Sequence, residues 1–73
     1  MIDISDVPAR GGFEIRVDGK PAGLAAYERD GNRRVFTHTE IDPAFGGQGL
    51  GGKLAAFALD AVRAAGERAV ARC

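Results

Sequence analysis

The stretch Gly46-Gly47-Gln48-Gly49-Leu50-Gly51-Gly52 decides how this sequence is interpreted, because five of its seven residues are glycine. Glycines let a backbone approach an anion closely, and the free N–H groups of a first helical turn point toward it. A plain loop does not need so many glycines, since each loses more conformational freedom on folding than any other residue. The stretch therefore predicts a backbone cradle for a pyrophosphate at the start of a helix.

Two common phosphate-binding patterns fit residues 47–52 by spacing alone. One is the dinucleotide-binding G-x-G-x-x-G, and the other is most of a P-loop that ends at Lys53. A P-loop needs Ser or Thr after the lysine to hold Mg²⁺, but Leu54 stands there. The dinucleotide pattern expects a preceding strand of a βαβ unit and an acidic residue about 20 positions on, which Glu67 matches poorly. The sequence around the glycines disfavours both.

Three predicted strands precede the glycines, at 12–18, 22–28 and 34–41, with turn residues at 18–21 and 30–32. Such short turns predict an antiparallel meander, closed by Asp42-Pro43. Alternation in the third strand predicts two faces, with Val35, Thr37, Thr39 and Ile41 on one and Phe36, His38 and Glu40 on the other.

After the glycines the apolar spacing becomes helical, with one stripe made of Leu50, Leu54, Phe57/Ala58, Ala61 and Ala65. Gly66 is placed to end this helix, and Arg68–Cys73 is expected to form a further strand. A strand, a helix and another strand imply a right-handed parallel crossover. The predicted fold is therefore α+β, an antiparallel β-meander followed by a β-α-β crossover, with a mixed sheet in a single domain spanning 1–73.

Composition narrows the classes of partner. Ten basic and ten acidic residues cancel, which disfavours nucleic acid and anionic membranes as partners. The single cysteine, Cys73, excludes an internal disulfide and a cysteine-based metal cluster, so no metal is expected. A chain of 73 residues has a small core, which favours a homodimer. No signal-peptide or membrane-spanning pattern occurs, and we expect a cytoplasmic protein with a bacterial type of composition.

The glycine stretch resembles the acyl-CoA site of the GCN5-related N-acetyltransferases, whose pattern is Gln/Arg-x-x-Gly-x-Gly/Ala. Gly49 and Gly51 match its last two fixed positions, whereas Gly46 stands where the family has Arg or Gln. The chain is most similar to the very small acetyltransferase-like members of the family. These share a strand with His-Thr, here His38-Thr39, an alanine-rich helix and a cysteine that ends the next strand, here Cys73. The resemblance runs from about Phe13 to Cys73 and stops before the C-terminal segment of those proteins, which this chain is expected to lack.

The resemblance implies a cofactor, acetyl-CoA, and a position for each of its parts. The pantetheine arm would run beside Thr39 to Ile41, in a gap between the third strand and the strand after the helix. The phosphates would lie on the turn. The implied cofactor-binding residues are Thr39, Ile41, Gly46, Gly47, Gln48, Gly49, Gly51, Gly52 and Lys53.

His38 and Cys73 are the candidate catalytic residues. His38 could accept the proton of an incoming amine, or it could be a partly buried histidine beside Phe36. Cys73 could protonate the departing thiolate or take the acyl group as a nucleophile, or it could be a small buried hydrophobe. Glu40 could act as a base or be a solvated strand residue. Lys53 could reach a phosphate or simply be an exposed helix lysine.

The sequence thus predicts a small N-acetyltransferase that moves an acetyl group from acetyl-CoA directly to the amine of a small molecule or protein. Two alternatives stay open. One is an acyl-CoA-binding or regulatory module without catalysis. The other is an interaction module that uses its exposed last strand to pair with a partner.

Overall fold

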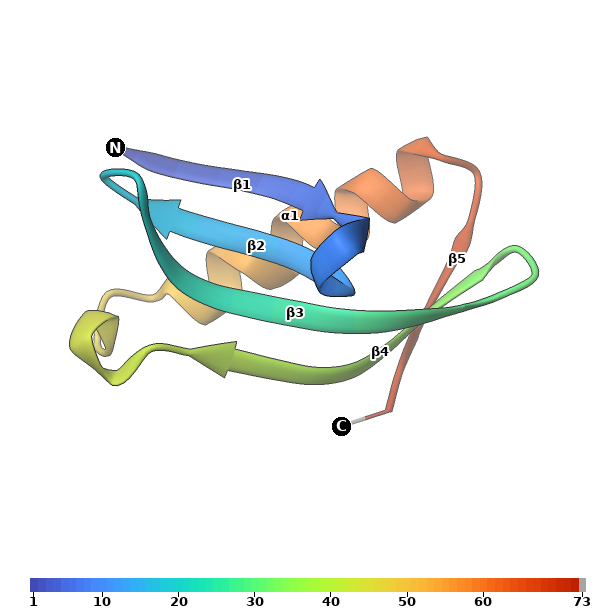
Figure 1. Cartoon of the computed structure of the whole chain (residues 1–73). Coiled ribbons are helices and arrows are strands. Elements are labelled where there is room, and N and C mark those ends of the chain that lie inside the picture. Colours follow the sequence, from blue (N-terminus) through green and yellow to red (C-terminus); the bar gives the residue numbers. More distant parts are fainter. Residues whose placement is uncertain (73) are drawn as a thin grey trace.

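The protein, described here by a computed structural model over residues 1–72, folds as a five-stranded sheet with one α helix on one side (Figure 1). The strands lie in the sheet in chain order, with antiparallel pairing from β1 to β4 and parallel pairing between β4 and β5. The predicted α+β class with a mixed sheet is confirmed. The elements are β1 (Ile2–Val7), the 3-10 turn η1 (Pro8–Arg10), β2 (Gly12–Val17), β3 (Lys20–Asp30), β4 (Arg33–Ile41), the 3-10 turn η2 (Pro43–Phe45), α1 (Leu50–Ala64) and β5 (Arg68–Ala71).

Tight turns join the meander where the sequence predicts them. Asp18 and Gly19 both have positive φ, 51° and 81°, which is the conformation of a two-residue hairpin turn whose twist matches its strands. Gly31, with φ of 62°, makes the turn between β3 and β4. Strand β3 extends two residues beyond each of its predicted ends and β4 begins one residue earlier than predicted, whereas β2 ends one residue sooner.

The N-terminal strand β1 is an element that sequence reasoning missed. It pairs antiparallel with β2 along its whole length, from Ile2 opposite Val17 to Val7 opposite Gly12. Its sequence contains Asp3 and Asp6, and aspartate is depleted in strands. The free edge of β2 therefore makes this segment a strand, rather than its own propensity.

A bulge in β4 makes the predicted alternation of that strand wrong. His38 pairs with Ala26 and Phe36 pairs with Tyr27, so Thr37 is an extra residue without an opposite partner on β3. An extra residue reverses the faces of everything beyond it. Phe36 therefore packs against the core, whereas the side chains of His38 and Glu40 are exposed.

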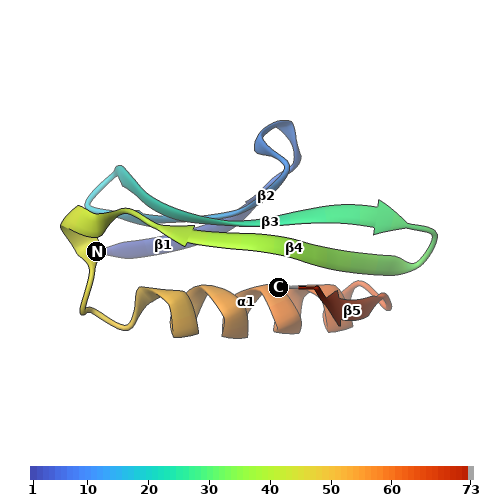
Figure 2. The same ribbon diagram turned by 90° about the horizontal axis from the view of Figure 1, so that it is seen from below.

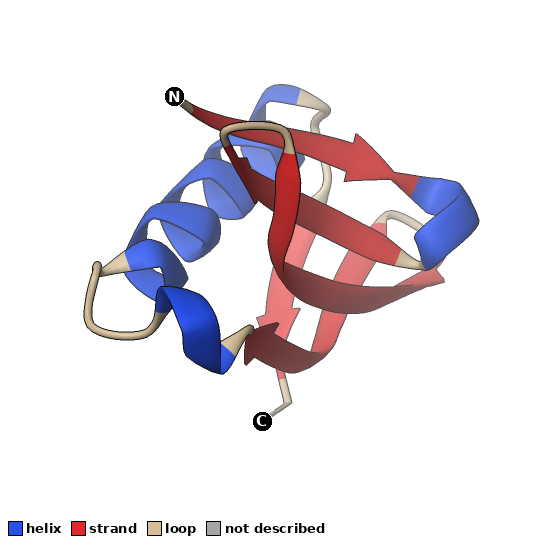
Figure 3. Ribbon diagram, turned by 60° about the vertical axis from the view of Figure 1, so that its left-hand side comes forward, coloured by secondary structure: helices blue, strands red, loops and turns tan. Residues whose placement is uncertain are grey.

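Helix α1 covers one face of the sheet (Figure 2). It buries a stripe at every fourth residue, Leu50, Leu54, Ala58 and Val62. Val62 was absent from the predicted stripe, and Phe57 is 41% exposed at its edge. The strands contribute Phe13, Ile15, Ala22 and Ala25 to the same core, and the twisted sheet curves around the helix (Figure 3). Within residues 1–72 the opposite face carries no α helix, and we call it the open face.

Arg34 joins the outer elements of the fold. Its guanidinium is almost fully buried, donates two hydrogen bonds of 3.1 Å to the carboxylate of Glu67 and lies 4.5 Å from the ring centroid of Tyr27. It also donates to Asp6 in β1 at 3.4 Å. One side chain of β4 thus holds β1, β3 and the segment before β5 together.

Candidate functional site

The parallel pairing of β4 with β5 ends halfway along β4. The last paired residues are Phe36 and Ala71, followed by one hydrogen bond of 2.9 Å from the Arg72 amide to the Phe36 carbonyl. Beyond this point residues 38–41 still pair with β3, but no described strand borders their other edge. The bulge at Thr37 lies at this transition. The second half of β4 therefore offers unpaired backbone groups to a ligand.

A small apolar pocket of about 180 Å³ lies beside this edge, between the sheet and α1. Thr39 is a lining residue that the sequence predicts for the pantetheine arm. The other lining residues were missed, although the i, i+4 spacing of Ala55 and Leu59 on the helix was a usable signal. The full set is Ala25, Phe36, Thr39, Ala55, Ala58, Leu59 and Ala71.

The glycine turn connects η2 to the start of α1. Gly46 follows η2 in an extended conformation, whereas Gly47 and Gly49 have φ of 78° and 69°. Gly49 occupies the N-cap of α1 and has no side chain to bond the first-turn amides. Those amides therefore remain available to an anion, as they are at any uncapped helix start.

Neither packing nor backbone conformation requires glycine at Gly51 and Gly52. A Cβ at Gly51 would meet only the Ile41 side chain, at an ordinary 3.9 Å, and one at Gly52 would meet nothing within 4 Å. Neither residue has positive φ, so alanine would fit and would favour the helix by about 1 kcal/mol at an interior position. The fold does not require these two glycines. A bare backbone surface is what a closely approaching pyrophosphate needs, so the residues present fit that group.

Gln48 and Lys53 are exposed at the same end of the helix. The Lys53 amide donates to the Gly49 carbonyl at 3.3 Å, which places this lysine in the first helical turn. Ile41, at the end of β4, packs partly against the core. Each predicted cofactor-binding residue therefore lies on β4, in the turn or in the first turn of α1.

His38 lies on the open face and not beside Phe36. Its Nε2 is 2.9 Å from Oε1 of Glu40, and the two side chains are 61% and 73% exposed. The bulge separates His38 from Phe36, so the interpretation of His38 as a partly buried packing residue is wrong. Cys73, the other predicted catalytic residue, lies outside the described residues.

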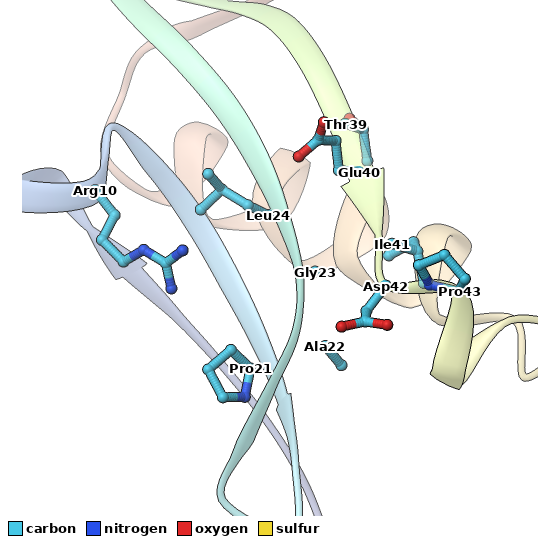
Figure 4. Close-up of a pocket in the computed structure, with 10 residues that line it drawn as sticks. All are labelled: Arg10, Pro21, Ala22, Gly23, Leu24, Thr39, Glu40, Ile41, Asp42 and Pro43. Atoms are coloured by element: carbon cyan, nitrogen blue, oxygen red, sulfur yellow. The ribbon is translucent and has the colours of Figure 1, made fainter.

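A second, larger pocket of about 680 Å³ lies on the open face (Figure 4). Thr39 also lines this pocket, so both pockets border β4. Sequence reasoning missed this pocket because its residues come from segments far apart in the chain. They are Arg10, Pro21, Ala22, Gly23, Leu24, Thr39, Glu40, Ile41, Asp42 and Pro43.

Glu14 is a buried carboxylate beside the open-face pocket. It is 2% exposed and accepts a hydrogen bond of 2.6 Å from Nε of Arg16 and another from Nη1 of Arg10. The bond from Arg16, followed by the attraction of both guanidinium charges, outweighs burial and lowers the pKa of Glu14. Glu14 is therefore charged near neutral pH and fixes Arg10 over the pocket.

Two further observations concern other classes of site. Within residues 1–72 no three His, Cys, Asp or Glu side chains are placed to hold a metal ion together. None of the helices in this part of the chain is long and apolar enough to cross a membrane.

Comparison with known proteins gives one positive result. A family model described as GCN5-related N-acetyltransferase matches residues 12–73, which is most of the chain. A search of curated proteins found no match. The matched region contains β2 to β5, the glycine turn and both predicted catalytic residues.

Proposed function

The chain belongs to the GCN5-related N-acetyltransferase family, and from this premise we propose that it transfers the acetyl group of acetyl-CoA to an amine. The observation that carries the proposal is the arrangement of the glycine turn, the unpaired edge of β4 and the apolar pocket. Along the chain the unpaired edge of β4 leads through η2 into the glycine turn, and Thr39 on this edge lines both the apolar pocket and the open-face pocket.

Different groups of the chain would bind different parts of the cofactor. The first-turn amides from Leu50 to Gly52 would bind the pyrophosphate, with Lys53 adding a positive charge. The unpaired backbone of residues 39–41 would hydrogen-bond the amides of the pantetheine arm as a neighbouring strand would. When bound, acetyl-CoA supplies an activated acetyl group as a thioester.

His38 is suited to accept the proton that the attacking amine must lose. Its Nε2 lies 2.9 Å from the Glu40 carboxylate, and in the proposed step Nε2 keeps the hydrogen while Nδ1 offers the lone pair. Glu40 orients the ring and stabilises the charge that it gains. The unpaired N–H groups of β4 would polarise the thioester carbonyl. Cys73 as the proton donor to the departing thiolate remains a prediction.

A second candidate function is binding of acyl-CoA without catalysis. Gly46 supplies no side chain where the family has Arg or Gln, and the His38 side chain is 61% exposed. A base so open to water is less well positioned than a buried one. The two candidates share the binding step and differ only in turnover.

Calorimetric titration of the full chain with acetyl-CoA and CoA tests the shared step. Saturable binding is expected for both ligands, and absence of binding would contradict both candidates. Acetyl transfer to a panel of amines, followed by mass spectrometry, then separates them. Turnover supports the acetyltransferase, whereas tight binding without turnover supports the binding module.

A further inference from the structure

We infer that the open-face pocket selects an acceptor that carries both an amine and a carboxylate, that is, a small amino acid zwitterion. The inference rests on the proposed function and names the substrate class of the same site. It is carried by opposite charges on the two walls of the pocket.

The wall on the β2 side is positive. Arg10 and Arg16 both contact Glu14, so two positive charges and one negative charge leave a net charge of +1. Arg10 is the member of this group that lines the pocket, and its side chain is 50% exposed. A guanidinium has five N–H donors, and the contact with Glu14 uses only part of them. Arg10 therefore keeps donors for a carboxylate.

The wall on the β4 side is negative. Glu40 and Asp42 both line the pocket and give a net charge of −2 when His38 is neutral. Oδ1 of Asp42 accepts a hydrogen bond of 2.9 Å from the Ala44 amide, which fixes that carboxylate at the end of β4. An ammonium group at this wall lies beside the His38–Glu40 pair.

The strand register places the two walls on either side of β3. Glu14 pairs with Leu24, and Leu24 pairs with Glu40, so the three residues form one row across the open face. Adjacent strands lie about 4.8 Å apart, which separates β2 from β4 by roughly 10 Å. Figure 4 shows the Arg10 side chain on one side of Leu24 and Glu40 on the other. A zwitterion that lies over Leu24 would meet a complementary charge at each end.

This order of charges also determines which end of the acceptor reacts. The amine is drawn to the β4 wall, where Thr39 also borders the apolar pocket beside the edge proposed for the pantetheine arm. The carboxylate is drawn to Arg10, away from the thioester. A diamine would instead place its second ammonium group against Arg10, and a simple alkylamine would leave Arg10 without a ligand.

The test compares matched acceptors with the full chain and acetyl-CoA: 4-aminobutyrate against butylamine, and lysine against cadaverine. We expect kcat/KM on the order of tenfold higher for each carboxylate-bearing member, the effect of one charge-assisted hydrogen bond. Equal values, or a preference for the amines that lack the carboxylate, would overturn the inference and leave the acetyltransferase proposal standing.

Two arginine variants test whether Arg10 is responsible for the preference for carboxylate-bearing acceptors. Arg10→Gln is expected to abolish the preference for the carboxylate. Arg16→Gln removes the same charge from this wall, but it leaves the guanidinium of Arg10 at the pocket, so a reduced preference should persist. A preference that survives in Arg10→Gln would overturn the assignment, and thermal unfolding of both variants checks that they remain folded.

A binding readout keeps this inference separate from the proposed function. Without acetyl-CoA, 4-aminobutyrate should shift the NMR signals of Arg10, Leu24 and Glu40, and butylamine should do so more weakly. If acetyl-CoA does not bind but these shifts appear, the acetyltransferase proposal fails and the zwitterion site stands. Equal shifts for the two ligands would count against the site.

Discussion

The two halves of β4 differ in what borders them, and this difference separates stability from binding. Residues 33–36 have a strand on each side and contain the buried Arg34. Residues 37–41 have a strand on one side only and contain exposed His38 and Glu40. The bulge at Thr37 marks the boundary. One strand thus contributes its first half to the fold and its second half to the candidate site.

The largest effect is expected from Arg34→Met in the first half. The substitution leaves the carboxylate of Glu67 without its buried partner, and breaking such pairs costs about 3–5 kcal/mol. Urea denaturation should show that loss in the free energy of unfolding. The neighbouring Arg33→Met is the control, because Arg33 is exposed and its loss should change stability by no more than about 0.5 kcal/mol. Equal effects of the two variants would contradict the division of β4.

In the second half, His38→Gln should affect chemistry and not stability. Loss of the proton acceptor is expected to lower kcat for acetyl transfer by about 100-fold. The dissociation constant for acetyl-CoA and the unfolding temperature should not change, because His38 is exposed and lines neither pocket. A His38→Gln variant that turns over at the wild-type rate would remove His38 from the proposed mechanism.

Substitution of the glycines at the start of α1 should increase the stability of the fold and weaken CoA binding. The double substitution Gly51→Ala and Gly52→Ala should raise the free energy of unfolding by about 1 kcal/mol, because alanine favours the helix and meets no obstacle. The added methyl groups should weaken CoA binding in a calorimetric titration. Ala56→Gly, on an exposed position of the same helix, should do the reverse by lowering stability without changing CoA affinity. CoA affinity unchanged in the double variant would contradict the cradle.

The smallest effect is expected in the pH dependence of the stability of the fold. The folded-state pKa of Glu14 is lowered, so the unfolded chain binds the proton more tightly and stability rises with pH between the two values. The stabilisation is complete above the unfolded-state pKa, near 4.5, and is lost as pH falls through the folded-state pKa. Thermal unfolding followed from pH 7 to pH 3 should show a shallower decline in Glu14→Gln than in the wild type. If the unfolding temperatures of the two proteins fell in parallel, Glu14 would not contribute to the pH dependence of stability.

Sequence reasoning predicted the features that short segments encode. The turns at Asp18-Gly19 and Gly31, the helix after the glycines and its end before Gly66 all follow from local backbone preferences and side-chain periodicity. It missed β1, whose aspartates argue against a strand, and the bulge at Thr37. Both depend on pairing with a neighbouring strand. Because the bulge was missed, Phe36 and His38 were assigned to one face when they lie on opposite faces.

By itself the amino-acid sequence determined the class of fold, the glycine turn and the family. These depend on residue types at fixed spacing, such as glycines that permit positive φ and apolar residues repeated at helical intervals. Only the tertiary structure decided that the glycine turn continues into an unpaired strand edge with a pocket on each side. Arg10, Leu24 and Glu40 are far apart in the sequence and line one pocket because Glu14, which binds Arg10, forms one row with Leu24 and Glu40 across three paired strands. Such proximity is a property of the sheet, and no local pattern encodes it.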